Sequence, residues 1–305
     1  MAAEVTCRLD ADPGSGPPVG SLVLQVGQRL ADRFTVLAFI SAGGMGEVYD
    51  AFDAVVGMRL AVKVVRQEIA SRPLALERLR SEVQLARRVS HRNVNRVFDL
   101  FADSALDGSV FYFLTMERLE GMTLEAHIGE RGRMPVEAAL QILRQVSAAI
   151  DASHCEGVVH CDIKASNVML VPREGEAPRA VVTDFGIAQS ENLVRERGSS
   201  STSCGTPSCM APEQRENREV GPPADIYAFG RLIQAVVDYP RTGAAGRCWR
   251  QTIASCLEPD PARRPESTGW VMERLSPDPG AAPRRGPSAP LAPSNHRSSP
   301  PSFRS

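Results

Sequence analysis

Three polar side chains suited to phosphate chemistry lie close together in the segment 159–167. Asp162, Lys164 and Asn167 fall between a long helical pattern and the apolar run 168–171, so we expect them on a short loop. A carboxylate can accept a proton, an ammonium can neutralise a phosphoryl group, and an amide oxygen can hold a hard cation. A solvated surface loop is the alternative interpretation.

Asp184 is a fourth candidate, because it ends a short apolar strand pattern and is followed by Phe185 and Gly186. A carboxylate at the end of a strand, with a glycine nearby, can bind a hard cation. Taken alone, the same pattern equally fits a strand that leads into an ordinary turn.

A glycine-rich turn, ISAGGMGEV, occupies residues 40–48 between two strand patterns. Glycines let the backbone approach a polyphosphate closely and offer N–H groups to its oxygens. An ordinary β-hairpin explains the pattern as well. A Rossmann dinucleotide turn is excluded, because a strand follows the glycines and not a helix.

Lysine is rare in this chain, since Lys63 and Lys164 are the only lysines among 35 basic residues. Lys63 ends the apolar pattern 60–63, and a simple explanation is that its ammonium reaches solvent. Glu82, however, falls on the apolar stripe of the helical pattern 74–89, and a buried carboxylate needs a partner. We therefore expect Lys63 and Glu82 to form an ion pair that orients the ammonium toward phosphates.

The elements that must position these residues are strands in the first half and helices in the second. A helical pattern at 74–89 interrupts the strands, and a longer one begins at Pro135, a residue that suits a first helical turn. The break lies near residue 120, which favours two unequal lobes over a doubly wound sheet. The strand patterns cover residues 34–40, 46–53, 59–65, 94–102 and 109–117.

Composition narrows the functional classes further. The 305 residues are 43% hydrophobic and carry a net charge of −1, so no overall field favours nucleic acid. No apolar run is long enough for a membrane span, and the seven scattered cysteines indicate reduced thiols and a cytoplasmic location. We expect a flexible leader at 1–26 and a disordered Pro/Ser/Arg-rich tail at 276–305.

All of these motifs occur in the order and spacing of the protein-kinase signature set. Over about residues 30–275 the chain resembles the bacterial eukaryote-like (Hanks-type) serine/threonine protein kinases. The resemblance implies an α+β, two-lobed kinase-like fold over residues 27–275. Its small β-rich N-lobe (27–119) would carry one helix, and its C-lobe (120–275) would be larger, mainly helical and shortened. The other matching segments are 211–213, 225–230 and 260–265.

The resemblance assigns catalytic roles to three residues and metal binding to two. Asp162 would accept the proton of the substrate hydroxyl, and Lys164 would neutralise the phosphoryl group in transfer. Lys63 would hold the α- and β-phosphates of ATP, while Asn167 and Asp184 would hold Mg²⁺. The position of Lys164, two residues after Asp162, resembles the serine/threonine pattern and not the tyrosine-kinase pattern.

ATP is expected to contact three further segments. The segment 116–119 resembles the hinge, in which the backbone of Glu117 and of Leu119 would pair with adenine, while Ala61 and Met169 would enclose the base. Lys63 and Glu82 would complete the nucleotide contacts together with the glycine-rich loop, which comprises Ile40, Ser41, Ala42, Gly43, Gly44, Met45, Gly46, Glu47 and Val48.

Several features depart from the family pattern. Ser41 replaces the first glycine of the loop, and Cys161 replaces an arginine that usually pairs with a phosphorylated activation loop. We therefore expect phosphorylation within 199–203 to have little effect on activity. Cys209 replaces a common tyrosine, and the segment 225–264 is short for the family. Residues 238–247 are expected to bypass a peripheral helix.

The function implied is transfer of the ATP γ-phosphoryl group to protein serine or threonine hydroxyls, with autophosphorylation. The expected partners are ATP and a protein substrate of unknown identity. The alternative is a pseudokinase-like scaffold that binds ATP and acts by association. A Pro/Arg tail that binds nucleic acid is a third interpretation, supported by few arginines. Glu213 and Arg264 are expected to form a structural ion pair.

Overall fold

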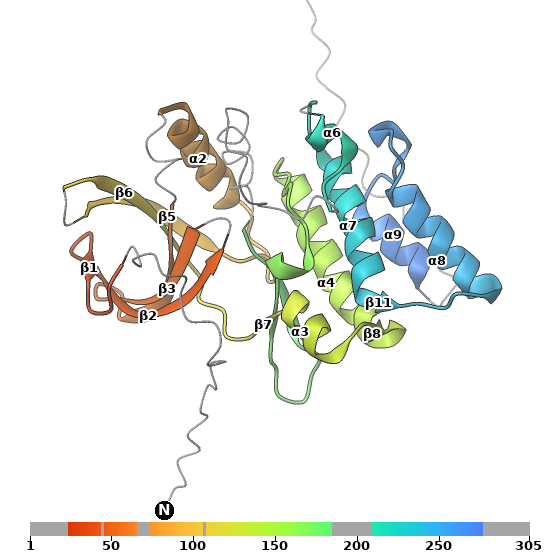
Figure 1. Cartoon of the computed structure of the whole chain (residues 1–305), viewed down its shortest axis with the longest axis horizontal. Coiled ribbons are helices and arrows are strands. Elements are labelled where there is room, and N and C mark those ends of the chain that lie inside the picture. The colour runs from red at the N-terminus through yellow and green to blue at the C-terminus, as the bar shows by residue number, and fades with distance from the viewer. Residues whose placement is uncertain are drawn as a thin grey trace, which may run out of the picture.

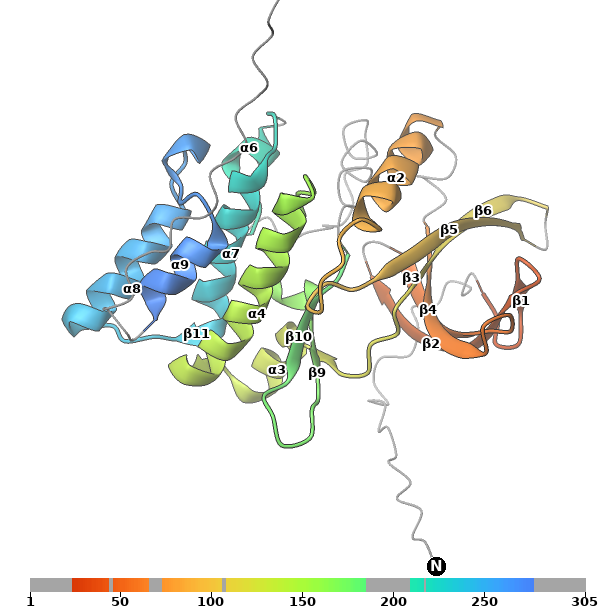
Figure 2. The same cartoon turned by 180° about the vertical axis from the view of Figure 1, so that it is seen from behind.

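The computed structural model describes residues 24–43, 46–65, 73–105, 108–184, 209–216 and 218–276. It has two lobes: a twisted sheet with one helix, and a larger bundle of helices (Figure 1). The α+β two-lobed fold expected from the sequence is thereby confirmed. Figure 2 shows a small hairpin, β9–β10, between the sheet and the helices.

The N-terminal lobe is a six-stranded antiparallel sheet in the order β1-β2-β3-β4-β6-β5. Its helix α2 (Pro73–Ala86) packs on one face through Leu79 and Val83, beside Leu114 of the sheet. Alternation along the strands sends Phe113 to the opposite face, as a pleated strand requires. The strands are β1 (Arg29–Leu30), β2 (Phe34–Gly43), β3 (Gly46–Asp53), β4 (Met58–Val64), β5 (Val97–Ser104) and β6 (Val110–Met116).

An aromatic cluster fills the face of this sheet opposite α2. The ring of Phe101 stacks on that of Phe113 at 5.4 Å and meets Phe34 edge-on at 5.0 Å. Leu24 is buried in the same cluster, and its N–H donates to the Tyr49 hydroxyl. Leu24 belongs to the leader that we expected to be flexible, so that expectation does not hold at residue 24. The remainder of the leader, 1–23, lies outside the described residues.

The C-terminal lobe is organised around α4 (Val136–Cys155) and α7 (Pro222–Val236). Apolar residues recur every three or four positions along α4, so one face of the helix is buried. Pro135, expected in the first turn, is instead the residue that caps α4, and α2 ends three residues before the predicted limit. Further helices are α3 (Leu124–Arg131), α6 (Pro212–Arg215), α8 (Gly243–Cys256) and α9 (Thr268–Leu275).

Short strands line the lobe boundary and one end of the bundle. The sheet β10-β9-β7 comprises β7 (Met122–Thr123), β9 (Val168–Val171) and β10 (Arg179–Val182). A parallel pair joins β8 (Met134–Pro135) to β11 (Val237–Asp238), and two 3₁₀ turns are η1 (Ala165–Asn167) and η2 (Pro261–Arg263). No helix in the described part of the chain is long and apolar enough to cross a membrane.

A buried ion pair links α6 to the segment before α9. Arg264 and Glu213 form two parallel hydrogen bonds of 2.6 and 2.8 Å. Three backbone carbonyl oxygens, of Glu258, Pro223 and Pro259, accept the other N–H groups of Arg264. All five donors of the guanidinium are therefore satisfied, which is the condition under which a buried charge is tolerated.

Candidate active site

Asp162 lies on the loop after α4 and is held by two neighbours. The Lys164 ammonium is 2.8 Å from Asp162 Oδ2. Asn167 Nδ2 donates to the backbone oxygen and to Oδ2 of Asp162, both at 2.9 Å. The three residues selected from the sequence are therefore brought together, with the Asp162 carboxylate in a fixed orientation.

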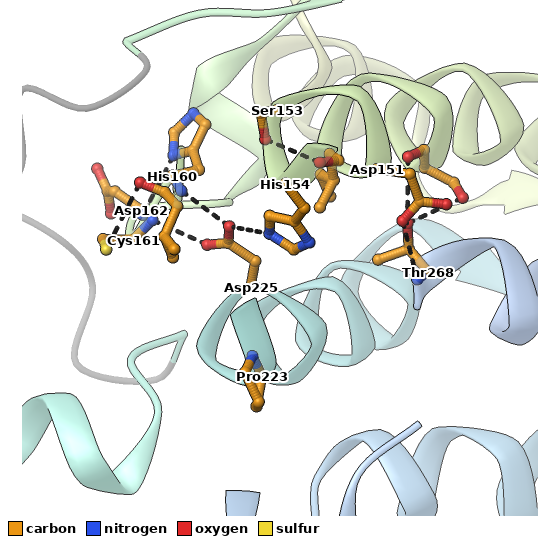
Figure 3. A network of polar contacts seen from close by, with 12 residues as sticks. Asp151, Ser153, His154, His160, Cys161, Asp162, Pro223, Asp225 and Thr268 are labelled. Carbon is orange, nitrogen blue, oxygen red and sulfur yellow. Dashed lines mark hydrogen bonds and ion pairs between the residues drawn. The ribbon is translucent and has the colours of Figure 1, made fainter. Parts of the chain in front are cut away.

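A second, fully buried carboxylate fixes the backbone of the same loop (Figure 3). Asp225, in the first turn of α7, accepts hydrogen bonds of 2.8 Å from the backbone N–H groups of His160 and Cys161. His154 Nε2, near the end of α4, lies 2.8 Å from Asp225 Oδ2. Because a carboxylate only accepts, this nitrogen must carry a proton. Cys161 has a φ of 67°, and these bonds hold it in that uncommon conformation.

His160 connects the loop to the strand that leads to Asp184. Its ring is buried, Nδ1 accepts the backbone N–H of Asp162 at 3.2 Å, and Nε2 lies 2.9 Å from the backbone oxygen of Thr183. Nε2 therefore donates, and the ring is the neutral Nε2–H tautomer. The backbone N–H of Thr183 donates in turn to Asn167 O, so the two polar segments are joined at two points.

Sequence reasoning assigned no role to His154, His160 or Asp225. One signal was available for Asp225, since it is an acid inside an otherwise apolar helical pattern, and such an acid must find donors when it is buried. The pattern could not indicate which donors those are. His154 lies on α4 and His160 on the loop that follows it, so only the packing of the folded chain brings them to Asp225.

Gln214 in α6 makes a further contact with the loop that carries Asp162. Its amide Nε2 donates to the backbone oxygen of Cys161 at 2.8 Å, while its Oε1 accepts the N–H of Ala211 at 3.0 Å. The Cys161 peptide is thus bound on one side by Asp225 and on the other by Gln214. Both bonds are made to the backbone, so they do not depend on the side chain at position 161.

Lys63 forms an ion pair with Asp184 and not with Glu82 among the described residues. The buried ammonium of Lys63, on β4, lies 2.7 Å from Asp184 Oδ1, just beyond β10. Glu82 is half-buried on α2. The expected Lys63–Glu82 pair is therefore incorrect for this structure. Helical periodicity places Glu82 toward the sheet, but it cannot show that another carboxylate lies closer to the ammonium.

The environment of Asp184 keeps its carboxyl ionised. Burial acts to raise the pKa of this group, but the charge and hydrogen bond of Lys63, together with the charge of Lys164, outweigh it. The net result is a pKa below the ordinary value. Asp184 also has a φ of 63°, an uncommon conformation for a residue other than glycine.

Asn167 and Asp184 fit the requirements of Mg²⁺ in a site completed by a nucleotide. The two hydrogen bonds from Asn167 Nδ2 go to Asp162, which leaves the amide oxygen Oδ1 as a ligand. No cluster of three or more His, Cys, Asp or Glu side chains suited to a metal occurs in the described ranges. Mg²⁺ is typically bound by one or two protein oxygens together with substrate phosphates, which agrees with this small donor set.

The expected adenine slot lies between β4 and β9. Ala61 is buried and pairs in register with Met116, at the start of the hinge, while Met169 lies half-buried on β9. The N–H of Glu117 is bound to Arg96 O. Within the described residues, Glu117 O and the N–H of Leu119 make no hydrogen bond, so both groups are available to a nucleotide base.

The glycine-rich turn joins β2 to β3, as expected for a loop over phosphates. Gly43 pairs with Gly46, Ser41 with Val48 and, on the next strand, Val48 with Lys63. Gly46 has a φ of 121°, and a Cβ there would lie 2.2 Å from Val64 O, so only glycine fits. Ile40, Ser41 and Ala42 are exposed, and Glu47 is half-buried. Gly44 and Met45 lie outside the described residues.

Comparisons with known proteins point to one family. Residues 34–242 match the protein kinase domain. The serine/threonine-protein kinase Pkn1 of Myxococcus xanthus is 33% identical over 265 residues, which cover 86% of this chain and 36% of Pkn1. PknA of Mycobacterium tuberculosis is 30% identical over 254 residues, which cover 82% of this chain and 57% of PknA. The chain thus spans about a third to three fifths of the length of these relatives.

The fold comparison agrees with the sequence comparison. The kinase domain of Mycobacterium tuberculosis PknI superimposes with a TM-score of 0.65 at 24% identity, covering 83% of this chain and 98% of that domain. The values for the wild-type domain and its variants are closely similar. Since the family match covers more than half of the sequence, the chain belongs to the protein kinase family.

Proposed function

We propose that the chain is an ATP-dependent serine/threonine protein kinase that phosphorylates protein hydroxyls, including its own. The observation that supports this most strongly is the convergence of five side chains from both lobes. Lys63 from the sheet meets Asp184, and the charge of Lys164 also acts on Asp184. Lys164 contacts Asp162, and Asn167 donates to Asp162.

In the proposed reaction the chain contributes positioning and charge. Asp162, oriented by Asn167, accepts the proton of the substrate hydroxyl as that oxygen attacks phosphorus. Lys164 stabilises negative charge on the transferring group, and Lys63 holds the phosphates that remain with ADP. Mg²⁺ supplies further neutralisation of phosphate charge when it is bound with ATP, and Asn167 and Asp184 are the residues that would hold it.

The completeness of this set favours catalysis over a pure scaffold. A chain that only binds ATP needs neither a proton acceptor nor a cation directed at the transferring group. Asp162 and Lys164 supply these two functions and lie in contact at 2.8 Å. Both side chains are also partly exposed, at 14% and 17%, so a substrate hydroxyl can reach them.

The test is Mg²⁺-dependent incorporation of phosphate from γ-labelled ATP by the purified chain and two variants. Asp162→Asn keeps the size of the side chain and removes the proton acceptor, so turnover should fall by about 100-fold or more. Asp238→Asn, at an exposed carboxylate on β11, is the matched control and should leave turnover unchanged. Thermal stabilisation by MgATP should persist in all three proteins.

Two results would overturn the proposal. If the wild-type chain transfers no phosphate to itself or to a generic basic protein but is stabilised by MgATP, it is an ATP-binding scaffold. If Asp162→Asn retains wild-type turnover, another group accepts the proton, and the assignment of Asp162 is wrong.

A further inference from the structure

The hinge carries two adjacent side chains of opposite charge that contact opposite lobes. Arg118 Nε lies 3.0 Å from Oδ2 of Asp50 on β3, in the N-terminal lobe. Glu117 Oε1 accepts a 2.6 Å hydrogen bond from Arg179 on β10, in the C-terminal lobe. The hinge is therefore fixed to both lobes by ion pairs, in addition to its backbone connection.

Each ion pair ends beside one wall of the expected adenine slot. The wall of the slot on β4 is the upper wall and the wall on β9 is the lower wall. Asp50 pairs in register with Ala61, which forms the upper wall. Arg179 lies on the strand that pairs with β9, and Val181 of that strand pairs with Met169 of the lower wall. The backbone two residues beyond the hinge also abuts β9, since a Cβ on Gly121 would lie 2.1 Å from Leu170 O.

Burial differs between the two ion pairs and indicates which one is stronger. The Asp50 side chain is 4% exposed and has a second partner in Arg59, so a buried acid is held between two arginines. Glu117 and Arg179 are 33% and 24% exposed, so water screens their attraction more. Among the residues that the structure describes, loss of Arg118 leaves Asp50 with only Arg59, whose side chain is 52% exposed.

We propose that Arg118 and Glu117 are positioning residues that set the separation of the two walls of the adenine slot. This inference rests on the proposed function, because it requires that the slot binds ATP. A slot whose walls are held in place before binding loses less conformational freedom when the base enters. The two ion pairs should therefore act on nucleotide affinity and KM for ATP, and much less on kcat.

The experiment measures the Kd of MgATP by calorimetry, together with KM, kcat and the unfolding temperature of the nucleotide-free protein. Arg118→Gln should weaken MgATP binding about tenfold, and Glu117→Gln about threefold, with kcat within about twofold of wild type. Arg118→Lys keeps the positive charge and should restore part of the affinity. Arg179→Glu should weaken binding, and the added change Glu117→Arg should restore it.

Arg33→Gln is the matched control, because it removes an ion pair to an equally buried acid, Asp53, at the end of β3 away from the glycine-rich turn. It should lower the unfolding temperature and leave the Kd unchanged. Unaltered MgATP affinity in Arg118→Gln, whatever its stability, would overturn the inference while the proposed function stands. Absence of MgATP binding by the wild-type chain would overturn the proposed function and this inference with it.

Discussion

The ammonium of Lys63 and the carboxylate of Asp184 lie 2.7 Å apart, although 121 residues separate them in sequence. One belongs to β4 of the N-terminal lobe and the other follows β10 of the C-terminal lobe, so the pair bridges the two lobes. The same two residues are expected to hold ATP phosphates and Mg²⁺. Lys63 therefore keeps Asp184 ionised, and each residue holds the other in place within a largely buried site.

Removal of Lys63 should change how Asp184 titrates. The pKa of Asp184 is below its ordinary value because Lys63 outweighs the effect of burial. Asp184 therefore stabilises the fold above the pKa it has in the unfolded chain, and this contribution is lost as pH falls through its lower folded pKa. In Lys63→Met burial acts unopposed by Lys63, so Asp184 should take up a proton at higher pH.

Unfolding free energies measured by urea titration across acidic to neutral pH test this expectation. The part of the acid decline that comes from Asp184 should be present in wild type and lost or reversed in Lys63→Met, because a carboxyl whose folded pKa no longer lies below its unfolded pKa gives the fold no stability by ionising. Lys63→Arg keeps the positive charge and serves as the control, which should follow the wild-type curve. An identical acid decline in Lys63→Met and Lys63→Arg would show that Lys63 does not set the ionisation of Asp184.

The Glu213–Arg264 pair predicts a large loss of stability when one partner is neutralised. Both side chains are almost completely inaccessible, and Arg264 uses all its donors. Glu213→Gln should therefore lower the free energy of unfolding by about 3–5 kcal/mol, because it leaves a buried charge without its counterion. Chemical denaturation followed by far-ultraviolet circular dichroism measures this loss.

An exposed ion pair three residues away supplies the comparison. Glu216 contacts Arg218 with side chains that are 60% and 52% exposed, so Glu216→Gln should change stability by less than about 1 kcal/mol. Burial raises the pKa of Glu213, but Arg264 lowers it more, so the pair should hold at neutral pH and weaken only in acid. Equal losses in the two variants would contradict the structural role of the buried pair.

Local patterns predicted the elements well. The run of β-branched and aromatic residues at 46–53 located β3, and the apolar spacing after Pro135 located α4. The polar loop that follows α4 was found from residue types, because it combines an acid and an amide with one of the two lysines of the chain. These features depend on residues that are neighbours in sequence, so the amino-acid pattern is sufficient to predict them.

Partners that are distant in sequence were not predictable in the same way. Periodicity indicated that Glu82 faces the sheet, yet the ion pair of Lys63 is formed with Asp184. The contact of Asp225 with His154 joins two helices and residues that are 71 positions apart in sequence. No local pattern indicates that these two residues meet in the fold. Such contacts depend on how the helices and the sheet pack, so they required the structure.

Activity should depend little on phosphorylation of the serine- and threonine-rich segment 199–203, which lies outside the described residues. Position 161 carries Cys, so the arginine that usually pairs with a phosphorylated loop is missing. The Cys161 backbone is instead held by Asp225 and Gln214, neither of which needs a phosphate. Replacement of residues 199–203 by Ala should therefore leave at least about half of the turnover, because no phosphate-dependent ion pair is lost.

Gln214→Leu, unlike the alanine replacement of 199–203, should lower activity. It removes the donor to Cys161 O and the acceptor for the N–H of Ala211. We expect kcat to fall about tenfold, the effect of losing about 1.4 kcal/mol of transition-state stabilisation, while MgATP affinity stays near wild type. Gln214→Glu retains the acceptor for Ala211 and lacks only the donor to Cys161, so it should show most of the same loss in kcat. Phosphate incorporation by the three variants, measured beside their unfolding temperatures, separates loop positioning from stability. Near-complete loss of turnover on replacing 199–203, with Gln214→Leu fully active, would show that a phosphate and not Gln214 orders the catalytic loop.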